Sequence, residues 1–269
     1  MRQGRITAIL QMGKVGSTAI RRALEGVGIE GILNGHHLSR ETLDRIERNY
    51  RDWDRPLPTS WQAGTEIRRR VIDAPAGKAE PIDIISIVRD PVARNLSGFT
   101  NAFHIPGREG LTDPAQVRIA SERFMAEHKH EWPLNWFDEQ LHATLGVDVY
   151  TRPFDHTGKN LHIGEASDAV RVLVLRLEDD DETKARALAQ FLDLPEIPEI
   201  PRANDTGHKT HAEASRRIRD AMVFDEAFLD RMYDHKMVRH FYTDTERARM
   251  KQRWLANGRG RAHEQRVPA

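Results

Sequence analysis

The segment IDIISIV (residues 82–88) constrains the fold more than any other stretch of the chain. Its aliphatic residues do not alternate with polar ones, so a strand formed here would be apolar on both faces. Strands of this kind lie in the middle of parallel sheets, where helices cover both faces. The segments AVRVLVLRL (169–177) and RITAIL (5–10) predict two further buried strands.

Segments with helical spacing alternate with these strands, which predicts an α/β fold with a mainly parallel central sheet flanked by helices. We expect weaker strands at residues 28–33 and 147–150, and a helical C-terminal part. No linker divides the chain, so we expect one domain over residues 1–256, followed by a disordered tail at 257–269. The helices expected before the C-terminal part are residues 17–26, 39–50, 58–73, a segment from Pro91, 132–146 and 180–194.

Composition excludes several classes of function. The 41 Lys and Arg residues balance the 41 Asp and Glu residues, so no global charge favours nucleic acid or an anionic membrane. The absence of cysteine excludes disulfides, thiolate metal sites and cysteine nucleophiles. No segment approaches the roughly 18 consecutive apolar residues of a membrane span. We therefore expect a cytoplasmic protein without stable membrane insertion; its oligomeric state is left open.

The stretch QMGKVGSTAIRRAL (11–24) places a glycine loop between the first strand and the first helix. Such a turn is an anion site, because the first helix amides lack partners and the helix dipole adds positive charge there. Lys14 supplies a full charge, and Ser17 and Thr18 supply hydroxyl donors. The order differs from a Walker loop, in which lysine directly precedes the hydroxyl residue. Taken alone, the loop is equally compatible with an ordinary turn that exposes a lysine.

A second stretch, VRDPVARNLSGF (88–99), places Arg89 at the end of the most apolar strand. Ligands of open α/β sheets bind at the carboxyl ends of strands, often where the strand order reverses. Arg89 can hold a phosphate through two hydrogen bonds, and Ser97 follows about two helical turns later. The alternative is that Arg89 pairs with Asp90 and that Arg94 lies on a solvated helix face.

Together the two stretches resemble the phosphate-binding motifs of sulfotransferases that use 3′-phosphoadenosine 5′-phosphosulfate (PAPS). QMGKVGST is similar to their 5′-phosphosulfate loop, although Met12 and Gly13 replace the commoner proline before the lysine. VRDPVARNLSGF is similar to their 3′-phosphate motif. The likeness is closest to bacterial carbohydrate sulfotransferases related to capsular polysaccharide synthesis.

The resemblance implies a P-loop-like, three-layer fold and a nucleotide donor, PAPS, that leaves as adenosine 3′,5′-bisphosphate (PAP). It places the 5′-phosphosulfate on Lys14, Val15, Gly16, Ser17 and Thr18, and the 3′-phosphate on Arg89 and Ser97. It also implies in-line transfer of the sulfuryl group to a hydroxyl acceptor, a saccharide or another small molecule. The leaving phosphate needs no metal, and Lys14 would stabilise its developing charge.

The acceptor hydroxyl must lose a proton, and histidine suits that role near neutral pH. His36 and His37, in the stretch LNGHHLS, are the first candidates for the base, and Glu66 is the rival. Lys209, in the loop PRANDTGHKTH, could close over the nucleotide. Two other functions remain: a P-loop nucleotide kinase, which would need Mg²⁺ and the Walker order, and a non-catalytic nucleotide-binding module of the same fold.

Overall fold

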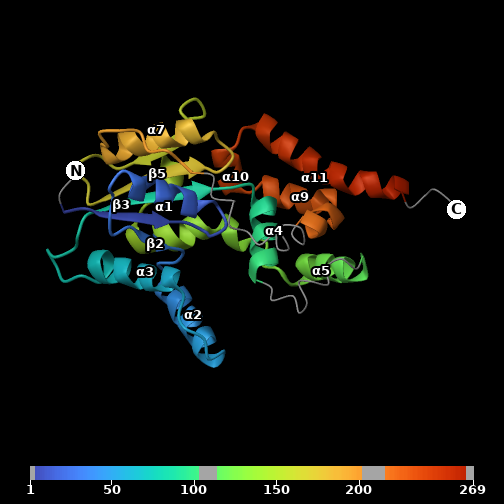
Figure 1. Ribbon diagram of the computed structural model, residues 1–269, viewed down its shortest axis with the longest axis horizontal. Helices are drawn as coiled ribbons and strands as arrows, with labels where there is room; N and C mark the ends of the chain where they lie inside the picture. The colour runs from blue at the N-terminus through green and yellow to red at the C-terminus, as the bar shows by residue number, and fades with distance from the viewer. Residues whose placement is uncertain (1–3, 103–113, 202–215, 265–269) are drawn as a thin grey trace. The chain divides into compact units, whose positions relative to one another are not determined.

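The computed structural model of the chain describes residues 4–102, 114–201 and 216–264 (Figure 1). The chain forms two compact units, each built from two separate stretches: residues 1–89 with 135–203, and residues 90–134 with 204–269. The expectation of one domain over residues 1–256 stays a prediction, and no described helix is both long and apolar enough to cross a membrane.

The first unit holds every strand of the described residues and packs helices around them. Its elements are β1 (Ile6–Leu10), α1 (Ser17–Gly26), β2 (Leu33–Gly35), α2 (Arg40–Asp52), α3 (Thr59–Ile67), a π-helical turn (Arg68–Ile72), β3 (Ile82–Val88), a second π-helical turn (Asp138–His142), α6 (Ala143–Leu145), a 3₁₀ turn (Val149–Thr151), β4 (Asn160–Ile163), β5 (Val170–Arg176) and α7 (Asp181–Leu192).

The five strands form one sheet in the order β2-β1-β3-β5-β4. All neighbours are parallel except β4, which pairs antiparallel with β5 at the edge. Every residue of β3 is buried, as expected for a central strand. In Figure 1, α3 lies beside β2 and α7 beside β5. The prediction of an α/β fold with a mainly parallel sheet is therefore confirmed.

The strand order reverses between β1 and β3. After β1 the chain continues to β2 on one side, whereas after β3 the next parallel strand, β5, lies on the other side. Such a reversal of the strand order is the position at which open α/β sheets generally bind ligands. Residues 11–16 follow β1, and Arg89 follows β3.

Two of the predicted strands are wrong. Gly28 and Gly31 have left-handed backbones with φ of 80° and 66°, so residues 28–32 do not form a strand and β2 begins only at Leu33. Residues 147–150 contribute to a 3₁₀ turn, because the Asp148 side chain accepts a hydrogen bond from the Tyr150 amide at 2.9 Å. The sequence also gave no signal for β4, a short edge strand.

The second unit is helical over its described residues. Its elements are α4 (Pro91–Ala102), α5 (Pro114–Glu127), a 3₁₀ turn (Trp132–Leu134), α9 (Glu226–Tyr233), α10 (Lys236–Phe241) and α11 (Asp244–Glu264). The buried Asp90 joins three of these helices: it accepts from the Val92 amide in α4, the Tyr233 hydroxyl of α9 and the Trp254 indole of α11. α11 extends through Glu264, into the segment expected to be a disordered tail.

Candidate functional site

The loop between β1 and α1 has an unusual backbone. Gly13, Lys14 and Gly16 all adopt left-handed conformations, with φ of 75°, 63° and 81°. For Lys14 this conformation costs on the order of 1–2 kcal/mol, because its Cβ approaches the following carbonyl. The side chains of Met12 and Val15 are buried and anchor the loop on either side of Lys14. Strain of this kind is typical of ligand-binding loops.

The N-terminus of α1 differs from that of α7 in the same unit. Its N-cap residue is Gly16, no side chain caps it, and its first turn contains no acidic residue. By contrast, α7 begins at Asp180, whose carboxylate accepts from the Thr183 amide. The helix dipole of α1 therefore faces no carboxylate of its own first turn, which favours an external anion there. Ser17 is half-buried and Thr18 is exposed at this end of the helix.

Gln11 joins the loop to the end of β2. Its side chain is fully buried, and its Oε1 accepts from the Gly13 amide. Its Nε2 donates to the Ser17 hydroxyl at 3.0 Å and lies 3.1 Å from Nδ1 of His36. The Gln11 carbonyl oxygen also lies 3.1 Å from the same ring nitrogen. One residue therefore contacts the loop backbone, a loop hydroxyl and the first candidate base.

The backbone around His36 and His37 is held from several directions. The Trp136 indole donates to the His36 carbonyl at 2.9 Å. The Gln140 side-chain oxygen accepts from the amides of Leu38 and Ser39 at 2.7 and 2.9 Å. Arg68 donates to the Leu38 carbonyl at 2.7 Å. These bonds fix the residues that follow β2 to the π-helical turn after α3 and to the segment after Asn135.

Arg89, which follows β3 as expected, contacts the loop after β1; its role at the 3′-phosphate stays a prediction. Its guanidinium donates to the Lys14 carbonyl at 2.8 Å, and its side chain is half-buried. Because guanidinium carries five donors, one bond to the loop is compatible with further bonds to a ligand. The contact places a permanent positive charge beside the loop that follows β1.

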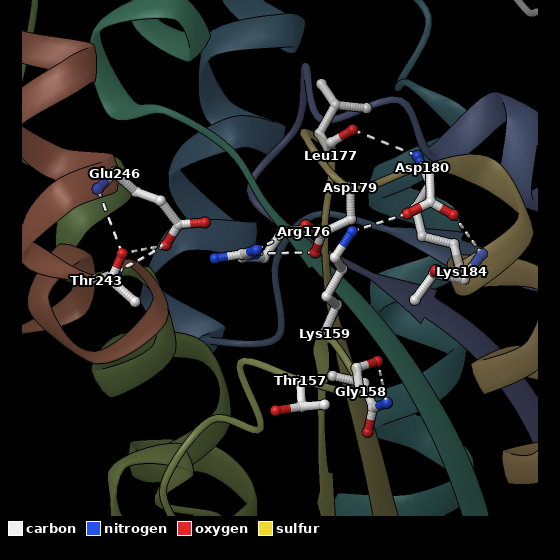
Figure 2. Close-up of polar contacts among 12 residues, drawn as sticks. Thr157, Gly158, Lys159, Arg176, Leu177, Asp179, Asp180, Lys184, Thr243 and Glu246 are labelled. Carbon is white, nitrogen blue, oxygen red and sulfur yellow. Dashed lines mark hydrogen bonds and ion pairs between the residues drawn. The ribbon is translucent and has the colours of Figure 1, made fainter.

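Leu177, which follows β5, packs against the loop. A Cβ on Gly16 would lie 2.7 Å from the end of the Leu177 side chain, which would have to shift, and the positive φ of Gly16 is what favours glycine at this position. The Leu177 amide donates to the Val88 carbonyl at 2.9 Å, and its carbonyl accepts from Lys184 at 3.3 Å. Figure 2 shows that contact together with the buried pair of Arg176 and Asp179, whose nearest atoms are 2.6 Å apart.

The other two candidate bases lie differently. The His37 ring is 6.4 Å from the His36 ring, centroid to centroid, and the two planes are close to perpendicular. Glu66, on α3, forms hydrogen bonds with Arg69 through both carboxylate oxygens, at 2.7 and 2.8 Å. This hydrogen bonding holds the pKa of Glu66 below its usual value, which weakens the carboxylate as a proton acceptor.

The remaining candidates belong to the second unit or lie outside the described residues. Ser97 is half-buried within α4. Arg94, on the same helix, is not on a solvated face: it is buried, and its guanidinium lies 4.8 Å above the Trp132 ring. Lys209 falls outside the described residues, so its proposed role over the nucleotide stays a prediction.

Comparison with known proteins gives one family. Residues 121–243, less than half of the chain, match a family described as "Putative capsular polysaccharide synthesis protein" (NKWYS). The match supports a role related to capsular polysaccharide. No curated protein and no solved structure matches the chain. The matched segment does not include residues 11–18 or Arg89, so the match and the loop geometry are independent observations.

Several residues of the site were missed from the sequence. Gln11 lies directly before the glycine loop, but a glutamine at the end of a strand carries no chemical signature of its own. Trp136 is fully buried, like an ordinary core residue, and its indole also donates to the backbone carbonyl of His36. Gln140, which is far from His36 in sequence, gave no signal before the fold was known.

Proposed function

We propose that the protein is a PAPS-dependent sulfotransferase that acts on a hydroxyl of a saccharide, and that its first unit is a P-loop-like fold. The observation that carries the proposal is one hydrogen-bonded network at the carboxyl edge of the sheet. It contains a left-handed glycine loop before α1, an arginine held to Lys14 at 2.8 Å, and His36 held to Gln11 at 3.1 Å. Sulfuryl transfer needs an anion cradle, a fixed positive charge and a proton acceptor.

In the proposed reaction, the acceptor oxygen attacks sulfur and forms the new S–O bond. The bond from sulfur to the bridging oxygen of the 5′-phosphate breaks, and PAP leaves with that electron pair. The amides and hydroxyls of residues 16–18 hold the phosphate, and Lys14 stabilises the charge that grows on the bridging oxygen. The acceptor proton passes to His36. In this proposal the leaving phosphate departs without a metal. The polysaccharide family match favours a saccharide as the acceptor.

His36 is the favoured base over its two rivals. It is in hydrogen-bond contact with Gln11, the residue that also contacts Gly13 and Ser17. Glu66 is engaged by Arg69, which lowers its pKa and its basicity. We expect His36→Asn to lower single-turnover transfer by about 10²–10⁴-fold, the usual range for a general base, with donor affinity nearly unchanged. Glu66→Gln is the matched control, and loss of turnover in that variant alone would reassign the base to the carboxylate.

Nucleotide selectivity separates this proposal from a kinase. We expect calorimetry to show PAP binding without Mg²⁺ and more tightly than Mg-ATP, and labelled sulfate to pass from PAPS to a capsular oligosaccharide. Preferred binding of Mg-ATP would overturn the proposal in favour of a phosphotransferase. Tight PAP binding without transfer to any tested acceptor would favour a non-catalytic binding module.

Arg89 provides a second test of the nucleotide assignment. We expect Arg89→Ala to weaken PAP binding by roughly 1.5–3 kcal/mol, the scale of a hydrogen bond to a charged group, and to weaken adenosine 5′-phosphate less. The control is Arg51→Ala on α2, whose exposed side chain pairs with Glu47. Equal losses of affinity for both nucleotides would show that Arg89 does not bind the 3′-phosphate. Ser97 as its partner stays a prediction from the sequence resemblance.

A further inference from the structure

Gln11 is placed where it can control both the anion loop and the base. It is fully buried, although glutamine is usually exposed, and each polar atom of its side chain has a partner. Its Oε1 fixes the Gly13 amide, and its Nε2 fixes the Ser17 hydroxyl. Its backbone carbonyl and its Nε2 both meet Nδ1 of His36.

The two contacts at His36 Nδ1 determine which ring nitrogen can accept a proton. A carbonyl oxygen can only accept, so the Gln11 carbonyl at 3.1 Å is satisfied when Nδ1 carries a hydrogen. The Gln11 amide nitrogen already has an acceptor in Ser17, so it does not need the ring. A protonated Nδ1 leaves the lone pair of the neutral imidazole on Nε2. The same Nδ1–H bond persists when Nε2 gains a proton.

We propose that Gln11 is a positioning residue that sets His36 in the tautomer with Nε2 unprotonated, and holds that ring in register with the anion loop. The inference rests on the proposed function, since it assigns the Nε2 lone pair to the acceptor proton. Gln11 acts through Gly13, Ser17 and His36 and touches no reacting atom. The bond that fixes the tautomer comes from its backbone carbonyl, and the side chain fixes the loop through the Gly13 amide and the Ser17 hydroxyl.

The charged and titratable groups described around His36 lie in the segments that follow β2, β1 and β3. His37 follows it in the chain, and Lys14 and Arg89 lie at the loop that Gln11 holds. Gln11→Glu would introduce a carboxylate beside Nδ1–H, with an acceptor still available to Gly13. A carboxylate beside imidazolium favours the charged form.

The experiment combines nitrogen-15 NMR of the histidines with pH–rate profiles. In the wild-type protein without ligand, we expect His36 to show the Nδ1–H tautomer, its signal being the one lost in His36→Asn. In Gln11→Glu we expect the pKa of His36, and the acidic limb of turnover, to move up by roughly one pH unit. In Gln11→Met we expect turnover to fall about 10- to 100-fold, with a smaller change in KM. This is the usual effect of removing a hydrogen-bonding residue that positions a functional group.

Gln140→Glu is the matched control, because Gln140 is also fully buried and its oxygen holds the same backbone without a described contact to the ring. An equal upward shift in that variant, or an Nε2–H tautomer in the wild type, would overturn the inference. If Gln11→Glu fails to fold, the turnover of Gln11→Met and the tautomer of His36 in the wild-type protein still test the inference. If His36 shows the Nδ1–H tautomer but no sulfuryl transfer is detected, the proposed function is wrong and this inference is not affected. If sulfuryl transfer occurs but does not change in the Gln11 variants, this inference is wrong and the proposed function is not affected.

Discussion

At the scale of single residues, Lys14 combines a strained, left-handed backbone with a positively charged side chain at the loop. The left-handed φ of 63° turns the chain so that its carbonyl meets Arg89, while the ammonium remains on a flexible stem. If Lys14 stabilises the leaving oxygen, Lys14→Ala should lower turnover by about 10²–10³-fold, the range for one lost stabilising donor, and should also weaken PAP binding. Single-turnover transfer and calorimetry measure the two effects.

Lys159 provides the control for that variant. It is also a lysine of the first unit with a left-handed backbone, φ 55°, but its ammonium pairs with Asp180 at 2.8 Å. Lys159→Ala keeps the same backbone constraint and should leave turnover and PAP affinity at wild-type values. If both variants lost turnover alike, the effect would come from the loop backbone or from stability, and the catalytic role of Lys14 would be refuted.

At the scale of elements, Gly64 sets how closely α3 approaches the end of β2. A Cβ at this position would lie 2.2 Å from the His37 carbonyl oxygen, a backbone atom that cannot move alone. We expect Gly64→Ala to lower the free energy of unfolding by roughly 1–3 kcal/mol, as overpacking does, and to lower turnover because the residues around His36 shift. Urea unfolding and single-turnover assays check the two effects.

Gly26→Ala is the matched control at the end of α1. A Cβ there meets nothing within 4 Å, so alanine should leave turnover unchanged and raise the free energy of unfolding by up to about 1 kcal/mol. A stable, active Gly64→Ala variant would show that α3 tolerates a larger separation from His37, and that its close approach does not position the base.

The elements that could be predicted from the sequence are those that depend on residues close together in the chain. The buried strands around Ile85 and Leu173 and the helix after Gly16 follow from apolar runs and glycine placement, and the loop and Arg89 follow from position at strand ends. Gly64 lies inside a helix, where glycine is unfavourable, and only the fold reveals the His37 carbonyl that excludes a side chain there. Gln140 could not be predicted either, because its partners lie about a hundred residues away.

At the scale of the whole molecule, the chain passes between the two units at residues 89–90, 134–135 and 203–204. Neither unit is a continuous segment, so neither can be isolated by removing one end of the chain. The second unit contains an aromatic cluster in which His128 stacks on Phe124 at 5.2 Å and His130 meets Phe124 edge-on at 4.7 Å. Nε2 of His128 is buried without a hydrogen-bond partner.

This cluster makes stability depend on pH. Burial lowers the pKa of His128 to about 4, and burial also lowers the pKa of His130. The unfolded chain binds a proton near pH 6.5, whereas the folded His128 stays neutral until about pH 4. Falling pH therefore favours the unfolded state within this window. The stability present above pH 6.5 should be lost progressively down to about pH 4, by about 2–3 kcal/mol after allowance for partial exposure.

The measurement is urea unfolding between pH 4 and pH 7, compared with His128→Phe. Phenylalanine keeps a ring that can stack on Phe124 and cannot titrate, so the variant should lose much of the slope while its stability at pH 7 changes little. His142, on the first unit, gives the control as His142→Phe, because its side chain is exposed and makes no described contact with the cluster. The slope belongs to His128 only if it falls in His128→Phe and persists in His142→Phe. A wild-type slope in His128→Phe would mean that other groups, such as acidic side chains with lowered pKa, control the acid response.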